Sequence, residues 1–141
     1  MKRSRSSRRS PREVFFDNHL APKLAHGLNQ MVEPEHEVVH LKDRFPVNME
    51  DALWMQALAR EADLGIVTAD IRISRNPHLV LAWKQAGHTT FFLKPGWVNL
   101  PFWDQANKFT KCFPQLIKVA ERAERGSAFL VTVKGKIEQL K

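Results

Sequence analysis

The sequence predicts a three-layer α/β/α sandwich with a mostly parallel sheet of four to five strands. Short apolar runs alternate along the chain with longer segments whose apolar residues recur at helical spacing. Such segments are long enough to cross over between parallel strands. The chain of 141 residues, 43% hydrophobic and 26% charged, also has the size and composition of one domain with one core.

The predicted strands are short, rich in β-branched and aromatic residues, and almost continuously apolar. A parallel strand that is covered on both faces has this composition, because neither of its sides faces water. In chain order, the predicted strands cover residues 14–16, 37–41, 64–68, 88–93 and 128–133.

The predicted helices lie between these strands and carry their own start and stop signals. They cover residues 20–31, 48–62, 77–87 and 101–124. Asn48 is the predicted N-cap of the second helix, with Asp51 in the position of a capping-box acid. Pro77 suits the first turn of the third helix and Gly87 its end. Pro114 predicts a kink or break in the fourth helix.

The chain divides into a basic arm, one domain and a polar tail. Residues 1–12 contain six Lys or Arg and no acid, and subtracting these six from the formal net charge of +7 leaves +1 for residues 13–141. Such an arm is too polar to fold alone, and it could hold phosphates without sequence preference or be a dispensable start. We therefore predict a disordered arm over 1–12, a domain over 13–134 and a tail over 135–141.

We expect a cytoplasmic protein that does not contact a membrane. No apolar run is long enough to cross a bilayer, and no apolar segment follows the basic start, so we expect no signal peptide. The single cysteine, Cys112, excludes an intramolecular disulfide and a multi-cysteine metal site, and it fits a reducing compartment.

Three acids are expected on one edge of the sheet. Asp17 follows the first predicted strand and Asp70 the third, and the carboxyl ends of parallel strands share one edge. The loop 42–48 leads from the carboxyl end of the second strand to the helix that carries Asp51, which places that acid on the same edge. An alternative for Asp70 is that it only caps the turn that follows it.

Carboxylates that converge in this way repel each other unless a cation lies between them. Mg²⁺ or Mn²⁺ suits such a site, because both ions bind carboxylate oxygens together with water and substrate phosphate. A cation of this kind activates water toward a phosphodiester and stabilises the charge that develops there. Neighbouring polar residues are suited to contact phosphate or to orient the acids. They are Thr68, Arg72, Arg75 and Asn76.

The order of several segments carries a family resemblance. These segments are Asp17, 20–25, 38–45, 50–54, 67–70 and 72–77. Together they resemble the PIN-like proteins of the short, toxin-like group, relatives of the PIN-domain ribonucleases of toxin–antitoxin modules. The resemblance implies an α/β sandwich that binds Mg²⁺ or Mn²⁺ through acids and cuts RNA, and it extends over about residues 13–97. It matches the metal-binding and catalytic acids of the family to Asp17, Asp51 and Asp70.

The sequence departs from the family pattern at two places. The segment after Asn76-Pro77 often carries a further acid in such proteins, whereas here it continues without one, so Asn76 is a candidate neutral oxygen ligand. Glu50 and Asp51 are adjacent, and successive helix residues lie about 100° apart, so only one of them can face the site. Glu50 precedes Trp54 by one helical turn, so the helical spacing favours Glu50, whereas the resemblance favours Asp51. We predict Asp51 as the metal ligand, with Glu50 as the alternative ligand.

These observations predict a metal-dependent ribonuclease, the toxin of a toxin–antitoxin module, with RNA, an antitoxin protein and a second copy of the chain as candidate partners. One alternative is a PIN-like binding module without activity. A lesser alternative is a phosphoacceptor receiver domain, which also has rim aspartates and a Lys-Pro pair, here Lys94-Pro95. Against it, Asp17 is not part of an acidic pair, and Lys94 follows the fourth strand, one strand too early.

Aromatic and histidine side chains leave further alternatives. Trp97, Phe102 and Trp103 could belong to the core, form a dimer surface or stack on bases. His40 and His88 fall within predicted strands, where histidines are more often satisfied core residues than ligands. His19, beside Asp17, is a candidate substrate contact.

Overall fold

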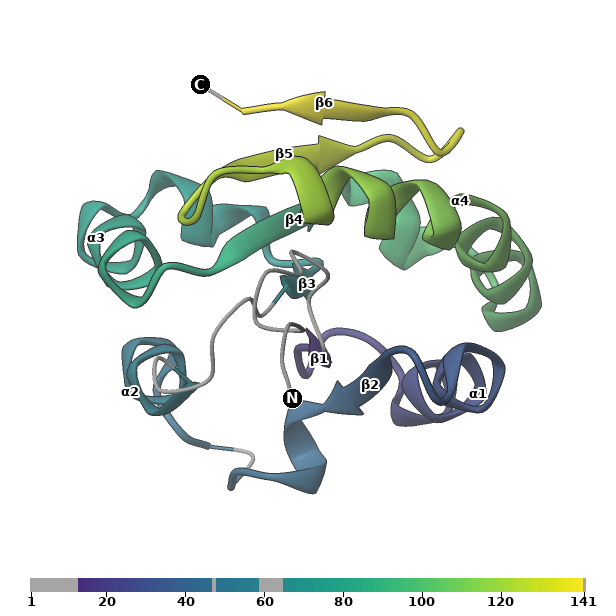
Figure 1. Ribbon diagram of the computed structural model, residues 1–141, viewed down its shortest axis with the longest axis horizontal. Coiled ribbons are helices and arrows are strands. Elements are labelled where there is room, and N and C mark those ends of the chain that lie inside the picture. The colour runs from purple at the N-terminus through teal and green to yellow at the C-terminus, as the bar shows by residue number, and fades with distance from the viewer. Residues whose placement is uncertain (1–12, 47, 59–64, 141) are drawn as a thin grey trace, which may run out of the picture.

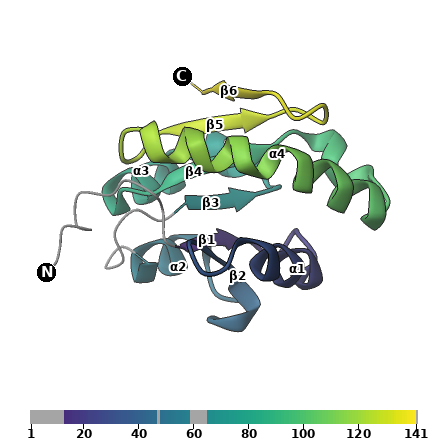
Figure 2. The ribbon, with the colours of Figure 1, turned by 45° about the vertical axis from the view of Figure 1, so that its right-hand side comes forward.

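The computed structural model describes residues 13–46, 48–58 and 65–140. It confirms the predicted fold class, because a mostly parallel sheet lies between two layers of helices (Figure 1, Figure 2). The predicted basic arm, residues 1–12, lies outside the described residues.

The sheet has six strands in the order β2-β1-β3-β4-β5-β6. Neighbouring strands are parallel except for β5 and β6, which run antiparallel. The strands are β1 Glu13–Phe16, β2 Glu37–His40, β3 Gly65–Thr68, β4 Thr89–Leu93, β5 Ala128–Val131 and β6 Ile137–Gln139. The first five coincide with the predicted apolar runs to within two residues at each end.

The sixth strand corrects the prediction of a polar tail over residues 135–141. The chain turns back after β5 at Gly135, whose φ of 92° lies in the left-handed region that favours glycine. The backbone N–H of Thr132 donates to the carbonyl of Lys136 at 2.9 Å, which begins the antiparallel pairing. The strand is three residues long and is held by backbone hydrogen bonds at the sheet edge, so it leaves no apolar pattern in the sequence.

Helices cover both faces of the sheet. They are α1 Pro22–Val32, α2 Asp51–Ala57, α3 Pro77–Ala86 and α4 Phe102–Arg122, with the short 3₁₀ helices η2 Leu41–Asp43, η4 Ile71–Arg75 and η5 Pro95–Asn99. The helices α1 and α4 lie on one face, and α2 and α3 lie on the other (Figure 1). In the described part of the chain, no helix combines the length and the apolar composition that crossing a bilayer requires.

The core lies on both sides of the sheet, because successive strand residues point to opposite faces. On one side Phe16 packs against Phe109 of α4, with ring centroids 5.2 Å apart. On the other side Phe92 packs against Trp83 of α3, with ring centroids 5.3 Å apart. Burying one such side chain contributes roughly 1.5–3 kcal/mol to the free energy of unfolding. The core therefore stabilises the strands whose carboxyl ends carry the predicted acids.

Two helix predictions need correction. The second helix begins at Asp51 with Glu50 as N-cap, so Asn48 precedes the helix instead of capping it. Its buried residues are Trp54, Met55 and Leu58, whereas Leu53 has an exposed fraction of 49%. Leu53 therefore faces solvent although it is apolar, because the packing of Trp54, Met55 and Leu58 determines which side of α2 is buried.

Of the kink or break predicted at Pro114, the break does not occur, because α4 continues through this residue. Pro114 is exposed, so water can satisfy the carbonyl that loses its helical partner.

The two strand histidines are satisfied core residues, as predicted. The His40 ring makes a hydrogen bond to the carbonyl of Leu20 at 2.6 Å and accepts one from the backbone N–H of Lys42 at 3.1 Å. The His88 ring bonds the carbonyl of Met55 at 3.0 Å, and burial lowers the pKa of His88. His40 thereby ties the end of β2 to the loop that follows β1.

Candidate functional site

Two of the predicted acids lie at the carboxyl ends of neighbouring strands. Asp17 directly follows β1, and its backbone N–H donates to the carbonyl of Val67 in β3 at 3.1 Å. Asp70 follows β3 by two residues. Because β1 and β3 are parallel neighbours, this edge of the sheet brings Asp17 and Asp70 together; we call them the acid pair.

Thr68 connects the two acids. Its hydroxyl donates a hydrogen bond to Oδ2 of Asp17 and accepts one from the backbone N–H of Asp70 at 3.0 Å. The Asp17 carboxylate is buried, with an exposed fraction of 5% for the residue. A buried carboxylate needs donors, and the chain supplies them locally at the end of β3.

His19 provides the other donors to Asp17. Its backbone N–H donates to Oδ1 of Asp17 at 3.1 Å, and its ring Nδ1 lies 3.4 Å from Oδ2. The hydrogen bond to Asp17 raises the pKa of His19, burial opposes this, and the charges of Asp17 and Asp70 add to the rise. The imidazole therefore holds a proton more readily than a free histidine does, beside the acid pair.

Arg72 forms an ion pair with the carboxylate of Asp70. Its Nε donates to Oδ1 at 2.8 Å and its Nη2 to Oδ2 at 3.0 Å, a two-point contact. The backbone N–H of Arg72 also donates to Oδ1 at 3.1 Å, so Asp70 is the N-cap of η4. The hydrogen bond from Arg72 lowers the pKa of Asp70, against the effect of burial.

The remaining predicted substrate contacts lie beside this edge. Asn76 is the N-cap of α3, and its side-chain oxygen accepts from the backbone N–H groups of His78 at 3.0 Å and Leu79 at 3.3 Å. That oxygen therefore caps the helix. Arg75 is exposed at the end of η4.

The third predicted acid is Asp51 or its neighbour Glu50. Glu50 is exposed at the N-cap of α2 and makes no side-chain capping bond. The side chain of Asp51 lies outside the described residues. Among the side chains that the structure describes, no three His, Cys, Asp or Glu form a group that could hold a metal ion. The described part of the predicted cluster is the acid pair.

Sequence reasoning did not assign His40 any part in supporting the site. Its hydrogen bond to the carbonyl of Leu20 fixes the loop that carries Asp17 and His19. The only signal in the sequence was a polar residue at the end of an apolar strand, which does not identify its partner.

Comparison with known proteins agrees with the fold. A family model described as PIN like domain matches residues 12–95, which include Asp17, Thr68 and Asp70. No curated protein and no solved structure matches the chain significantly. The family match spans more than half of the 141 residues. The chain therefore belongs to the family of PIN-like domain proteins.

Proposed function

We propose that this chain is a metal-dependent ribonuclease whose centre is the acid pair. The observation that carries the proposal is the connection from the backbone of Asp70 through the hydroxyl of Thr68 to the buried carboxylate of Asp17. It lies at the carboxyl ends of neighbouring parallel strands in a PIN-like domain, and that class of domain includes nucleases.

The donor set fits Mg²⁺ or Mn²⁺. These ions bind through one or two carboxylates and complete their coordination with water and phosphate oxygens. Asp17 and Asp70 would supply the carboxylates, and the family resemblance adds Asp51. Arg72 must leave Asp70 for this, and with an exposed fraction of 80% its side chain can swing into solvent at small cost. A bound cation would offset the charge of the acids and stabilise charge that develops on phosphate.

The surrounding side chains have distinct tasks in this proposal. Thr68 fixes the orientation of the Asp17 carboxylate through its hydroxyl. His19 is about half exposed and lies beside Asp17, where its imidazole could donate to a phosphate oxygen. Arg72, once displaced from Asp70, can donate to phosphate oxygens through the same guanidinium edge.

Cleavage of an end-labelled single-stranded RNA in the presence of Mn²⁺ tests the proposal. Asp17→Asn should lower the cleavage rate by about 100-fold or more, the scale on which a lost electrostatic contact to the transition state acts. Glu124→Gln, a change of an exposed acid after α4, is the matched control and should cleave at the parent rate. An Asp17→Asn protein that cleaves as fast as the parent would contradict the proposal.

The proposed toxin role has its own readout. Expression of the parent chain should arrest the growth of the host cells, and Asp17→Asn should relieve the arrest. A parent chain that cleaves RNA in solution but leaves growth unchanged would contradict the toxin role and leave the ribonuclease proposal intact.

One observation favours a second candidate, a PIN-like binding module without metal. Arg72 already offsets the charge of Asp70 through its two-point contact, so the described acids need no cation to be stable. Titration with Mn²⁺ followed by calorimetry separates the two candidates. Binding heat that Asp17→Asn removes supports the ribonuclease, and no heat at millimolar metal supports the binding module.

A further inference from the structure

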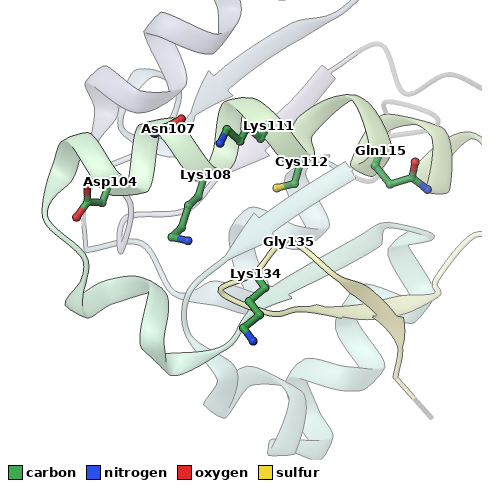
Figure 3. Close-up of a pocket in the computed structure, with 8 residues that line it drawn as sticks. All are labelled: Asp104, Asn107, Lys108, Lys111, Cys112, Gln115, Lys134 and Gly135. Atoms are coloured by element: carbon green, nitrogen blue, oxygen red, sulfur yellow. The ribbon is translucent and has the colours of Figure 1, made fainter.

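A groove lies between α4 and the turn from β5 to β6, outside the segment that the family model matches. Its volume is about 650 Å³. Figure 3 shows its lining side chains, which come from one side of α4 and from the facing turn. The lining residues are Asp104, Asn107, Lys108, Lys111, Cys112, Gln115, Lys134 and Gly135.

The groove carries uncompensated positive charge. The lining residues include three lysines, Lys108 and Lys111 of α4 and Lys134 of the turn, and one acid, Asp104, which leaves a net charge of +2 among them. None of the three lysines has an ion-pair partner in the part of the chain that the structure describes. Since residues 13–141 carry only +1 in total, this groove concentrates the positive charge of the domain.

The buried residue of the groove, Cys112, contributes no charge to it. Cys112 is buried there, and burial raises the pKa of its thiol to about 11, so it stays uncharged and unreactive near neutral pH. Gly135 lies in the turn beside Cys112 with a φ of 92°, which favours glycine, and a Cβ at this position would lie 3.4 Å from Cβ of Cys112. The lysines on the rim therefore decide what the groove attracts.

The β5–β6 turn that borders the groove lies at the same edge of the sheet as the acid pair. The turn after β5 follows the carboxyl end of a strand that is parallel to β4 and β3, and Figure 2 shows the β5–β6 turn on the side where β3 ends. Two strand spacings, roughly 10 Å, separate β5 from β3 along the sheet. A short extended strand of nucleic acid can span that distance.

An exposed aromatic residue, Trp103, lies at the start of α4, next to the groove residue Asp104. Trp103 has an exposed fraction of 80%, the highest of the large apolar side chains in the described residues. It packs edge-on against Phe102, with ring centroids 5.6 Å apart, and Lys23 of α1 lies 4.3 Å above the Phe102 ring. These contacts hold the start of α4 against the start of α1, which follows the loop that carries Asp17.

We propose that this groove binds the backbone phosphates of single-stranded RNA that extends from the acid pair, with Trp103 stacking on a base. The inference rests on the proposed ribonuclease function. A positively charged groove that follows the backbone, flanked by an aromatic platform, is how proteins hold single strands without sequence preference. The uncharged amides of Asn107 and Gln115 add hydrogen-bonding groups along the path.

The first test measures binding without cleavage. A labelled single-stranded oligoribonucleotide is titrated by fluorescence anisotropy in the presence of EDTA, using the full chain so that the basic arm stays constant. The groove variant carries Lys108→Gln, Lys111→Gln and Lys134→Gln. The matched control carries Lys84→Gln, Lys118→Gln and Arg122→Gln, which remove the same charge from exposed positions that do not line the groove.

The groove variant should bind RNA about 10-fold or more weakly than the parent, and its salt dependence should fall by a slope of about 2, as the loss of three phosphate contacts predicts. The control should change affinity by less than about 3-fold. Trp103→Ala should weaken binding by about 5-fold or more, and Trp103→Phe should retain most of the affinity. Thermal midpoints equal to the parent's verify that the exposed substitutions leave the fold intact.

The outcomes separate the two proposals. A groove variant that binds RNA like the charge-matched control overturns the groove proposal, even if Asp17→Asn abolishes cleavage. A groove variant that loses RNA affinity while Asp17→Asn cleaves at the parent rate supports RNA binding in the groove and contradicts the ribonuclease centre. If the groove variant loses affinity for polyglutamate but binds RNA as tightly as the parent, the groove binds an acidic peptide and the inference is overturned.

Discussion

The hydroxyl of Thr68 donates a hydrogen bond to the buried carboxylate of Asp17, although 51 residues separate the two in the chain. The same hydroxyl accepts from the backbone N–H of Asp70, which it can do because a hydroxyl is both donor and acceptor. The contact depends on the parallel pairing of β1 with β3. The relative position of the two acids therefore depends on Thr68 and on the register in which β1 pairs with β3.

Thr68→Val should lower the free energy of unfolding by about 1–3 kcal/mol, because valine keeps the volume but leaves the buried carboxylate of Asp17 without its hydroxyl donor. Thr90→Val is the matched control. The hydroxyl of Thr90 is fully buried in β4 and has no hydrogen-bond partner among the described residues, so its removal should be neutral or stabilising. Urea unfolding of both variants measures the difference, and equal stability of Thr68→Val and the parent would contradict this role of the hydroxyl.

His19→Gln should reduce the pH dependence of stability. The hydrogen bond to Asp17 raises the pKa of His19 above its ordinary value of 6.5. Protonation of His19 therefore contributes stability that is fully present below about pH 6.5 and is lost as the pH rises through the raised pKa. The stability difference between parent and variant should be larger at about pH 6 than at about pH 9.

Urea unfolding at the two pH values measures this difference. The same substitution in an Asp17→Asn background is the control, because the partner that raises the pKa of His19 is then neutral. A pH-dependent difference that persists in that background would show that it does not arise from the contact between His19 and Asp17.

Arg72→Gln should strengthen Mn²⁺ binding, by several-fold up to about 10-fold, because the guanidinium occupies both oxygens of Asp70 that a cation would use. Arg75→Gln removes the same charge from the exposed end of η4 and is the control. Isothermal titration of both variants gives the affinities. Weaker binding after Arg72→Gln would mean that the arginine supports the metal site instead of competing with the metal.

The cleavage assay should also identify the third acid. Position 51 precedes the buried Trp54 and Met55 by three and four residues, so its backbone lies on the same side of α2 as these core residues. Glu50 precedes the exposed Leu53 by three residues and is itself exposed. Asp51→Asn should therefore lose cleavage and Glu50→Gln should keep it. The reverse result would make Glu50 the ligand.

The predicted strands agree with the structure because their signal is local. Runs such as Val14–Phe16 are apolar throughout, and only a strand covered on both faces accommodates them. The position of Asp17 and Asp70 after such strands was sufficient to expect them on one edge, since parallel strands end together. By contrast, β6 has no such signal, because backbone pairing with β5 holds its three residues.

The start of α2 shows a second limit of local patterns. Asn48 and Asp51 have the spacing of a capping box, yet the helix begins only at Asp51. The burial of Trp54, Met55 and Leu58 against the sheet determines how the helix is turned, and this packing outweighs a capping preference worth about 1 kcal/mol.

The sequence by itself determined the fold class, the positions of the first five strands in the chain and the acids that end β1 and β3, because hydrophobic periodicity and turn residues act over a few neighbouring positions. Only the tertiary structure decided which groups those acids meet. Thr68 reaches Asp17 across the sheet, and Lys134 lines the same groove beside α4 as Lys108 and Lys111. These residues lie far apart in the chain, so only the pairing of strands and the packing of α4 bring them together.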